Sequence, residues 1–293
     1  MGDRMSNRKL PNLVRRDLIL ATSLVGLSPV MAGTESSATM KIGLTPVFLD
    51  SRSGFLQRWR QYLEHELGHS VTFVQRRSYA DILEMLLNGQ LNAAWLCGYP
   101  YVRYKTVLQL VAVPRYQGAP LYAAYIISGP SASNVKRFAE LRGKVFAYSD
   151  PLSNSGFLFA KDQLDSIGEN DSGFFRKSFF AFGHQNVISA VSEGLADAGS
   201  VDGYVWDSLQ KIKPELTQKT RILARSRKFG FPPFVAPENL PRDTVLRLRK
   251  SLIGMQASSV GKNLLSELNL DGFEVGRPSL FKDIEDMAKR VRA

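Results

Sequence analysis

Two histidines flank a glutamate in the stretch HELGHS, residues 65–70, and form the pattern His-Glu-x-x-His. When such a pattern lies within one helix, both histidines face the same side and hold a zinc ion. The glutamate then serves as the general base of a peptidase. His65, Glu66 and His69 are therefore the first residues whose types and spacing suggest chemistry.

The residues around this pattern argue against a zinc site. Apolar side chains recur at four-residue steps at Phe55, Trp59, Leu63 and Leu67. This spacing predicts a helix, and Gly68 has the position of its C-terminal cap, so His69 would lie beyond it. A third ligand is also hard to find, because His184 is the only other histidine. We expect no metal site and keep a zinc metallopeptidase only as a third hypothesis.

Polar side chains gather at the expected start of another helix, in the stretch SDPLSNSGFLFAKDQL, residues 149–164. Ser153, Asn154, Ser155 and Gly156 follow a strand and a breaking Asp-Pro pair, and then open the helix. Free backbone N–H groups, polar side chains and the positive end of a helix meet there, which is an arrangement that binds anions. Ordinary N-capping by the two serines is the alternative.

Cys97 is the only cysteine, so no disulfide within the chain is possible. It directly follows an expected strand, at the end where open α/β sheets bind ligands. In one interpretation it is a small buried hydrophobic residue. In the other its thiol faces a cleft and binds a soft, thiophilic solute. Tyr99 and Tyr101 follow it, and their hydroxyls either hold an oxyanion or belong to core packing.

Short apolar strands alternate with amphipathic helices along the chain, which favours an α/β fold with a parallel or mixed sheet. The expected strands are 41–44, 71–75, 93–96, 110–113, 122–127, 144–148, 178–181, 198–201 and 221–224. The expected helices are 54–67, 79–88, 155–167, 186–193, 205–211, 242–255 and 282–291. These elements must position the candidate residues.

The first 32 residues are typical of an export signal. Basic residues precede an apolar run, residues 18–32, that is too short to span a bilayer comfortably and ends in a small-residue cleavage site. The pair Arg15 and Arg16 leaves the twin-arginine and Sec routes both open, and an uncleaved membrane anchor is the alternative. A linker rich in Gly, Thr and Ser follows at residues 33–39. We expect a periplasmic protein.

Charge and composition limit the classes of partner. The chain has 293 residues, of which 44% are hydrophobic, enough for one large domain or two lobes with buried cores. Its net charge of +11 suits anionic small molecules. The basic residues are scattered and form no dense tract, so we expect no nucleic-acid partner.

Several ordered motifs resemble one family over much of the chain, from about Lys41 to the C-terminal region. They are YADIL (79–83), LNAAW (91–95), LRGKVFAY (141–148), DPLSNSG (150–156), FGH (182–184) and DAGSVD (197–202). Together they resemble the phosphate/phosphite/phosphonate (PhnD-like) type of periplasmic solute-binding protein of ABC transporters. The segment around Cys97 is also similar to the arsenite-binding members of this superfamily, which work with a membrane histidine kinase.

The resemblance implies a two-lobed α/β fold of the type II periplasmic binding proteins, with hinge closure around a ligand in the cleft. By analogy, the serine-rich helix start and His184 grip an anionic head group. Tyr101 and Asp202 complete the pocket from the opposite walls. The family commonly has Ser-His-Asp where this chain has Gly183-His184-Gln185, so the usual support of the histidine is in doubt.

These observations lead to a non-enzymatic binding protein without a cofactor. We expect lobe 1 to contain residues 40–135 with the C-terminal elements 225–293, and lobe 2 to contain residues 136–224. The expected ligand is a small oxyanion, delivered to the membrane permease of an ABC transporter. The alternative is a periplasmic sensor that binds arsenite through Cys97 and signals to a membrane sensor kinase.

Overall fold

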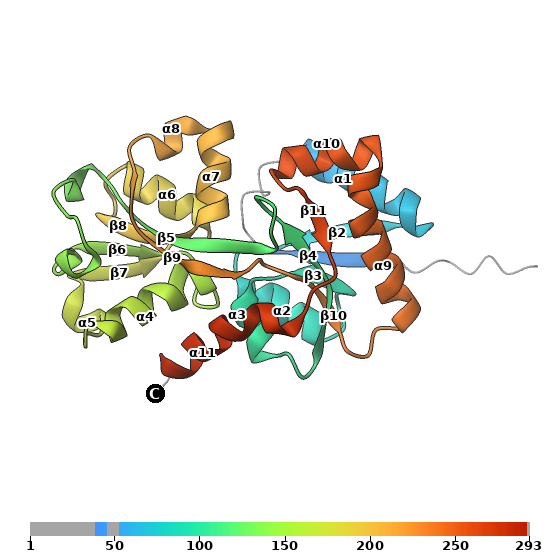
Figure 1. Ribbon diagram of the computed structural model, residues 1–293, viewed down its shortest axis with the longest axis horizontal. Helices are drawn as coiled ribbons and strands as arrows, with labels where there is room; N and C mark the ends of the chain where they lie inside the picture. The colour runs from blue at the N-terminus through green and yellow to red at the C-terminus, as the bar shows by residue number, and fades with distance from the viewer. Residues whose placement is uncertain (1–38, 46–52, 292–293) are drawn as a thin grey trace, which may run out of the picture. The chain divides into compact units, whose positions relative to one another are not determined.

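The structure is a computed structural model that describes residues 39–45 and 53–291. It contains two β-sheets, each with helices on both faces (Figure 1). The expected signal peptide, residues 1–32, and all of the linker except Thr39 lie outside the described residues. In the part of the chain that is described, no helix is long and apolar enough to cross a membrane.

The first sheet has six strands in the order β11-β4-β10-β3-β1-β2. Their bounds are β1 Met40–Leu44, β2 Val71–Gln75, β3 Ala93–Trp95, β4 Leu108–Arg115, β10 Phe234–Pro237 and β11 Gly272–Glu274. β1 pairs in parallel with β2 and β3, whereas β10 and β11 pair antiparallel to their neighbours. The sheet is therefore mixed.

Helices cover both faces of this sheet (Figure 1). On one face lie α1 Ser53–Leu67, α9 Arg242–Gly254 and α10 Ser259–Leu268. On the other lie α2 Tyr79–Leu87 and α3 Gly98–Arg103, and α11 Lys282–Arg290 packs against α3 and also contacts α4 Phe159–Ser166 and β9 Arg221–Gly230 of the second lobe. The buried face of α1 consists of the apolar residues that the four-residue spacing predicted, with Tyr62 in addition. Trp59 is its centre, because its ring contacts those of Phe73, Trp95 and Phe234.

The second sheet has five strands in the order β7-β6-β8-β5-β9. Their bounds are β5 Leu121–Ser128, β6 Val145–Tyr148, β7 Lys177–Phe180, β8 Ala198–Asp202 and β9 Arg221–Gly230. β6 pairs in parallel with β7 and β8, and β5 pairs antiparallel to β8 and β9. In Figure 1, α4 Phe159–Ser166 and α5 Asp171–Phe174 cover one face, and α6 His184–Ser192, α7 Gly203–Ile212 and α8 Pro214–Thr217 the other.

Short helices of other types complete the chain. Four are 3₁₀-helices, η1 Pro130–Ala132, η2 Phe138–Leu141, η4 Met255–Ala257 and η5 Pro278–Phe281, and one is a π-helix, η3 Asn154–Leu158. The π-helix runs directly into α4, so the expected helix 155–167 consists of two parts with different hydrogen bonding.

The chain passes between the two sheets twice, at residues 116–120 and 231–233. The two crossings touch, because the N–H of Phe231 donates to the carbonyl of Pro120 at 2.9 Å. Two sheets joined in this way form the two lobes of an α/β fold, as the sequence predicted. The lobe limits 135/136 and 224/225 stay a prediction; β5 and the whole of β9 pair within the second sheet.

All nine expected strands and all seven expected helices are present, with ends shifted by up to six residues, the largest shift being at the end of β9. The elements that the sequence pattern did not predict are β10, β11, α3, α5, α8 and α10. Of these, β10 and β11 have only four and three residues, too few for a period to be recognised. Short strands of this kind form because the neighbouring strand β4 offers free backbone groups.

Candidate functional site

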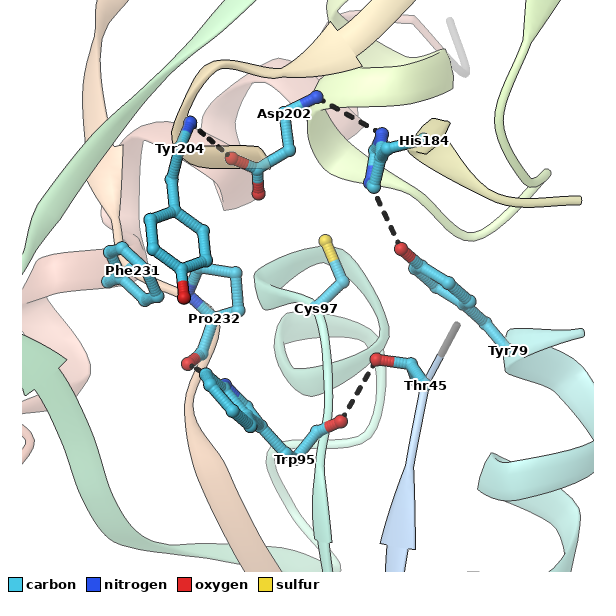
Figure 2. A pocket seen from close by; sticks show the side chains of 9 residues that line it. All are labelled: Thr45, Tyr79, Trp95, Cys97, His184, Asp202, Tyr204, Phe231 and Pro232. Atoms are coloured by element: carbon cyan, nitrogen blue, oxygen red, sulfur yellow. Dashed lines mark hydrogen bonds between the residues drawn. The ribbon is translucent and has the colours of Figure 1, made fainter. Parts of the chain in front are cut away.

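The candidate site lies where parallel strands of both sheets end. Thr45 follows β1, Cys97 follows β3 by two residues, and Asp202 is the last residue of β8. In open α/β sheets, ligands bind beyond the carboxyl ends of the strands. The residues that line the cavity there are Thr45, Tyr79, Trp95, Cys97, His184, Asp202, Tyr204, Phe231 and Pro232 (Figure 2).

The cavity is small and is formed by both lobes. Its volume is about 10 Å³, which holds about one water molecule. Tyr79 and Cys97 come from the first lobe, whereas His184 and Asp202 come from the second. No lysine or arginine of the described ranges lines it. A ligand held there contacts both lobes, as hinge closure requires.

His184 is the first residue of α6 and connects the two lobes. Its Nδ1 accepts a hydrogen bond from the backbone N–H of Asp202 at 3.1 Å, so the proton of the neutral ring lies on Nε2. Nε2 lies 3.1 Å from the hydroxyl of Tyr79 and donates to it (Figure 2). Burial lowers the pKa of His184 to about 3. The ring is therefore neutral near pH 7, and the Tyr79 proton is left for another acceptor.

This chain lacks the family pattern Ser-His-Asp, and backbone groups support His184 instead. The N–H of Asp202 holds the ring from one side, as described above. Before the histidine, Phe182 adopts a φ of 51°, a left-handed conformation that is strained for a bulky residue. Asn186 stabilises this turn by donating to the carbonyl of Ala181 at 2.9 Å. Strained loops of this kind are common at functional sites.

Asp202 places an uncharged carboxyl group at the cavity. Its Oδ1 accepts a hydrogen bond from the N–H of Tyr204 at 2.8 Å, and this bond caps α7. Asp202 is 3% exposed, and this burial raises its pKa to about 8. The carboxyl group is thus mostly protonated at pH 7 in the ligand-free site. A protonated carboxyl group donates a hydrogen bond to an oxyanion, whereas the ionised form would repel it.

The Cys97 thiol points into the cavity. Figure 2 shows its sulfur in the space surrounded by Asp202, Tyr204 and His184. The sulfur accepts the backbone N–H of Asn154 at 3.2 Å, at the start of the helix predicted to bind anions. Burial raises the pKa of the thiol to about 11. Cys97 is therefore a buried thiol rather than a thiolate, and it lines the cavity instead of belonging to the core alone.

The helix start at residues 153–156 has an unusual geometry. Ser153 caps it by accepting the N–H of Gly156 at 2.9 Å, and the N–H of Leu158 reaches back five residues to the Ser153 carbonyl at 3.0 Å. This widened π-turn is a feature often found at functional sites. Gly156 has no space for a side chain, because a Cβ would lie 1.7 Å from the Ser149 hydroxyl.

Three buried oxygens near this helix start have no hydrogen-bond partner of good geometry among the described residues, although Tyr122 lies close to Ser155. They are the hydroxyls of Ser149 and Ser155 and the side-chain oxygen of Asn154. The Asn154 amide donates to the hydroxyl of Tyr122 at 2.9 Å. Buried polar groups without partners cost free energy, so each calls for an explanation. A bound polar ligand that displaces the Cys97 sulfur from the Asn154 N–H would supply partners.

An aromatic wall closes the other side of the cavity. It consists of Trp95, Tyr204 and Phe231, with Pro232 beside them (Figure 2). The ring of Tyr204 contacts that of Phe231, with centroids 4.9 Å apart. The indole N–H of Trp95 donates to the carbonyl of Pro232 at 2.8 Å. The cavity thus has a polar side and an apolar side.

The structure brings most of the predicted site residues together. Cys97, His184 and Asp202 line the cavity, and the helix start at residues 153–156 contacts it through Cys97. Tyr99 and Tyr101 are buried but do not line the cavity. Tyr101 packs its ring against Phe281 at 4.9 Å, and the guanidinium of Arg103 lies 5.7 Å from the centre of the Tyr99 ring.

Sequence reasoning did not identify the remaining lining residues as ligand contacts. Tyr79 offered a signal, because it follows the N-cap Ser78 at the start of α2. Tyr204 also offered one, since it lies two residues after Asp202. Phe231 and Pro232 come from the second crossing between the sheets, and no local pattern marks them.

The His-Glu-x-x-His stretch forms no metal site. α1 ends at Leu67, Gly68 has a φ of 73°, and His69 lies beyond the helix, as expected. The ring of His65 lies on the exposed surface, beside Glu66 at 3.2 Å. Among residues 39–45 and 53–291, no group of three or more His, Cys, Asp or Glu is arranged to hold a metal ion. The stretch is the end of a surface helix.

The curated proteins that share detectable sequence identity with the chain include two PhnD-type proteins. One is the phosphate-import protein PhnD of Mycolicibacterium smegmatis, 30% identical over 148 residues, which are 47% of this chain and 46% of the relative. The other is a probable ABC transporter phosphite-binding protein, PhnD1 of Prochlorococcus marinus. It is 21% identical over 280 residues, which cover 90% of this chain and 92% of the relative.

Many solved structures share the fold, among them those of two binding proteins. PhnD1 of Prochlorococcus marinus in complex with methylphosphonate superposes with a TM-score of 0.76 at 17% identity, covering 87% of this chain and 98% of that one. A binding-protein component of an ABC phosphonate transporter from Pseudomonas aeruginosa gives a TM-score of 0.79 at 17% identity, covering 87% and 86%. At this identity the likeness concerns the fold, that of the type II periplasmic binding proteins.

The chain also matches a protein family over residues 42–281, most of its length and nearly all of the described part. The family comprises binding proteins, which are periplasmic and carry no enzymatic activity, so the peptidase hypothesis is wrong. Its members are binding components for phosphonate-type ligands in ABC transporters. The chain belongs to this family, the phosphonate-type periplasmic substrate-binding proteins of ABC transporters.

Proposed function

We propose that this protein captures a small phosphorus oxyanion, of the phosphite, phosphate or phosphonate class, and delivers it to the permease of an ABC transporter. One observation carries the proposal: the helix start at residues 153–156 is buried beside the cavity with unpartnered polar oxygens. Ser155 is fully buried there. A helix start with free polar groups and a positive dipole end favours an anion.

The surrounding groups support the same ligand class. Tyr79 and protonated Asp202 have hydroxyl protons to donate to oxyanion oxygens. His184 stays neutral because its pKa is lowered by burial, so it orients Tyr79 rather than adding charge. Binding then depends on hydrogen bonds and the helix dipole, because no cationic side chain among the described residues lines the cavity.

The test is a calorimetric titration of purified protein with phosphite, phosphate and methylphosphonate, repeated on the variant Ser155→Ala. A hydrogen bond to a charged group contributes about 1.5–3 kcal/mol, so we expect the variant to bind about tenfold more weakly or worse. Ser166→Ala is the matched control, because this serine is exposed on α4 and bonds only the carbonyl of Gln163. Equal affinity in both variants would contradict the assignment of Ser155.

A second function is favoured by the position of Cys97. Its sulfur lies in the cavity and occupies the N–H of Asn154, where an anion oxygen would otherwise bind. A trivalent arsenic oxyacid is thiophilic and nearly uncharged, which suits a thiol among neutral groups. In this alternative the protein is a periplasmic arsenite sensor whose partner is a membrane histidine kinase rather than a permease.

The two functions are separated by repeating the titration with arsenite on the wild type and on Cys97→Ser. Serine keeps the size and a hydrogen-bonding atom but removes the soft ligand. Arsenite binding that disappears in Cys97→Ser, without binding of any phosphorus oxyanion, supports the sensor. Binding of a phosphorus oxyanion that survives the substitution supports transport and leaves Cys97 as a packing residue.

A further inference from the structure

We propose that Trp95, Tyr204 and Phe231, the aromatic wall, restrict the site to an oxyanion without an organic substituent. This inference rests on the proposed function and narrows its ligand class from phosphonates in general to phosphite and phosphate. Alkylphosphonates carry the same head group with a carbon chain attached. The wall lies on the side of the cavity opposite His184 and Tyr79 (Figure 2), so a chain that points away from these polar groups would meet it.

The size of the cavity is the first argument. A volume of about 10 Å³ holds about one water molecule, so even a bare oxyanion, which has several heavy atoms, needs the lining side chains to move apart. Each additional methyl or methylene group requires further space of similar size. Because protein interiors are packed as densely as organic crystals, this space must come from displacement of the wall.

The wall residues are locked by their own contacts. The hydroxyl of Tyr204 donates to the carbonyl of Leu268 at 2.5 Å, and its ring lies between those of Tyr116 and Phe231, with centroids at 5.2 and 4.9 Å. Trp95 stacks on Phe234 at 5.2 Å. None of the three wall residues is more than 5% exposed. Their side chains therefore have no solvent-filled space into which to rotate.

The backbone behind the wall is fixed as well. Gly203, directly before Tyr204, has no space for a Cβ, which would lie 2.6 Å from the Ala123 carbonyl and 2.7 Å from the Tyr125 ring. This close packing holds the start of α7 against β5. The N–H of Phe231 donates to Pro120 at 2.9 Å. A wall anchored in both side chains and backbone acts as a size limit rather than as an adaptable surface.

The primary test uses the wild-type protein and calorimetric titration with phosphite, phosphate, methylphosphonate, ethylphosphonate and 2-aminoethylphosphonate. We expect phosphite or phosphate to bind, methylphosphonate to bind at least about tenfold more weakly, and the two-carbon compounds more weakly still. Equal affinities across the series would overturn the size limit while the proposed function stands. Absence of binding for every compound would overturn the proposed function, and this inference with it.

A variant pair tests whether the wall sets the limit. Phe231→Leu shortens a wall residue, and Phe229→Leu is the matched control two residues earlier, at the end of β9, since Phe229 is also buried but does not line the cavity. We expect the ratio of ethylphosphonate to phosphite affinity to rise about tenfold or more in Phe231→Leu only.

Thermal melting establishes first that each variant is folded. If Phe231→Leu does not fold, Trp95→Phe replaces it, because this substitution also reduces a wall residue while keeping an aromatic ring. An unchanged affinity ratio in the folded wall variants would overturn the proposal. A ratio that rises equally in Phe229→Leu would also overturn it, because the effect would then be general loosening.

Discussion

At the scale of single residues, the site is built from ionisable groups that burial keeps uncharged. His184 and Asp202 have pKa values displaced toward their neutral forms, to about 3 and about 8, and Cys97 is held as a thiol by a pKa of about 11. In each case desolvation is the largest cause, because the free-energy cost of charging a buried group exceeds the stabilisation that its few hydrogen bonds provide. An empty site of this kind avoids unpaired charges.

The Asp202 carboxyl group should make stability pH-dependent. Its pKa is about 8 in the folded protein and about 3.9 in an unfolded chain. Between these values the folded state holds a proton that the unfolded state has lost. Rising pH therefore favours unfolding by up to about 1.4 kcal/mol per pH unit. This contribution is fully present below about pH 4 and is lost as the pH rises through about 8.

The measurement is urea unfolding of ligand-free wild type and Asp202→Asn between pH 5 and pH 8. Asparagine keeps the oxygen that caps α7 through the N–H of Tyr204 but does not ionise. We expect wild type to lose stability relative to the variant as the pH rises. His184 contributes in the opposite sense, below about pH 6.5, in both proteins. A constant difference across this range would show that Asp202 is ionised in the folded protein.

At the scale of elements, the π-helical start η3 determines how polar groups reach the cavity. Its wide turn leaves Ser155 and the Asn154 oxygen buried without partners, and it is possible only because Gly156 lies against Ser149. The carbonyl of Ser155 is held by the hydroxyl of Ser200 at 2.6 Å. This hydrogen bond therefore anchors η3 to β8 of the second sheet.

Gly156→Ala should disrupt this element. Its Cβ would lie 1.7 Å from the Ser149 hydroxyl, so the turn must shift, at a cost of about 1–3 kcal/mol in unfolding free energy. We expect weaker ligand binding together with a lower melting temperature. Gly173→Ala is the control, because its Cβ would approach Asn170 only to 3.4 Å. Unchanged binding and melting of Gly156→Ala would show that the helix start adapts freely.

At the scale of the whole molecule, polar contacts hold the two lobes together around the cavity. The Asp150 carboxylate of the second lobe accepts the N–H of Tyr79 from the first at 3.0 Å. On α7 of the second lobe, Lys211 donates to Asn269 at 2.6 Å, and Tyr204 bonds Leu268. The described conformation therefore corresponds to a closed state. Its free energy relative to an open state sets the ligand affinity.

One interlobe contact is suited to a test of this coupling. The hydroxyl of Tyr116, in the first crossing next to β4 of the first lobe, donates to Asp207 of α7 at 2.9 Å. The hydroxyl of Tyr125 donates to the same carboxylate oxygen at 3.1 Å from within the second lobe. Tyr116→Phe should destabilise the closed state by about 1 kcal/mol and weaken ligand affinity about fivefold.

Tyr125→Phe is the matched control, because it removes an equivalent bond that does not cross between the lobes. Small-angle X-ray scattering of ligand-free protein should give a larger radius of gyration for Tyr116→Phe than for Tyr125→Phe. Titration should show weaker binding for Tyr116→Phe only. Equal effects of both substitutions would mean that Asp207 acts through the stability of the second lobe rather than through closure.

Sequence reasoning predicted the features that depend on local periodicity. The four-residue spacing of Phe55, Trp59 and Leu63 determined the buried face of α1, because a helix repeats its faces within a few residues. Strand-to-helix transitions at Ser153 and Asp202 were recognisable for the same reason. These features depend on neighbours in the chain, and they determined the α/β class and the position of Cys97 after a strand. His184 and Asp202 were assigned from the family resemblance.

Only the tertiary structure decided which side chains face the cavity. Tyr101 follows Cys97 by one helical turn, yet its ring packs on Phe281, 180 residues later in the chain. Phe231 and Pro232 reach the cavity because the second crossing pairs with the first at Pro120. The aromatic wall, the size of the cavity and the neutral state of Asp202 all result from contacts between distant segments, and burial by those segments has no local signature.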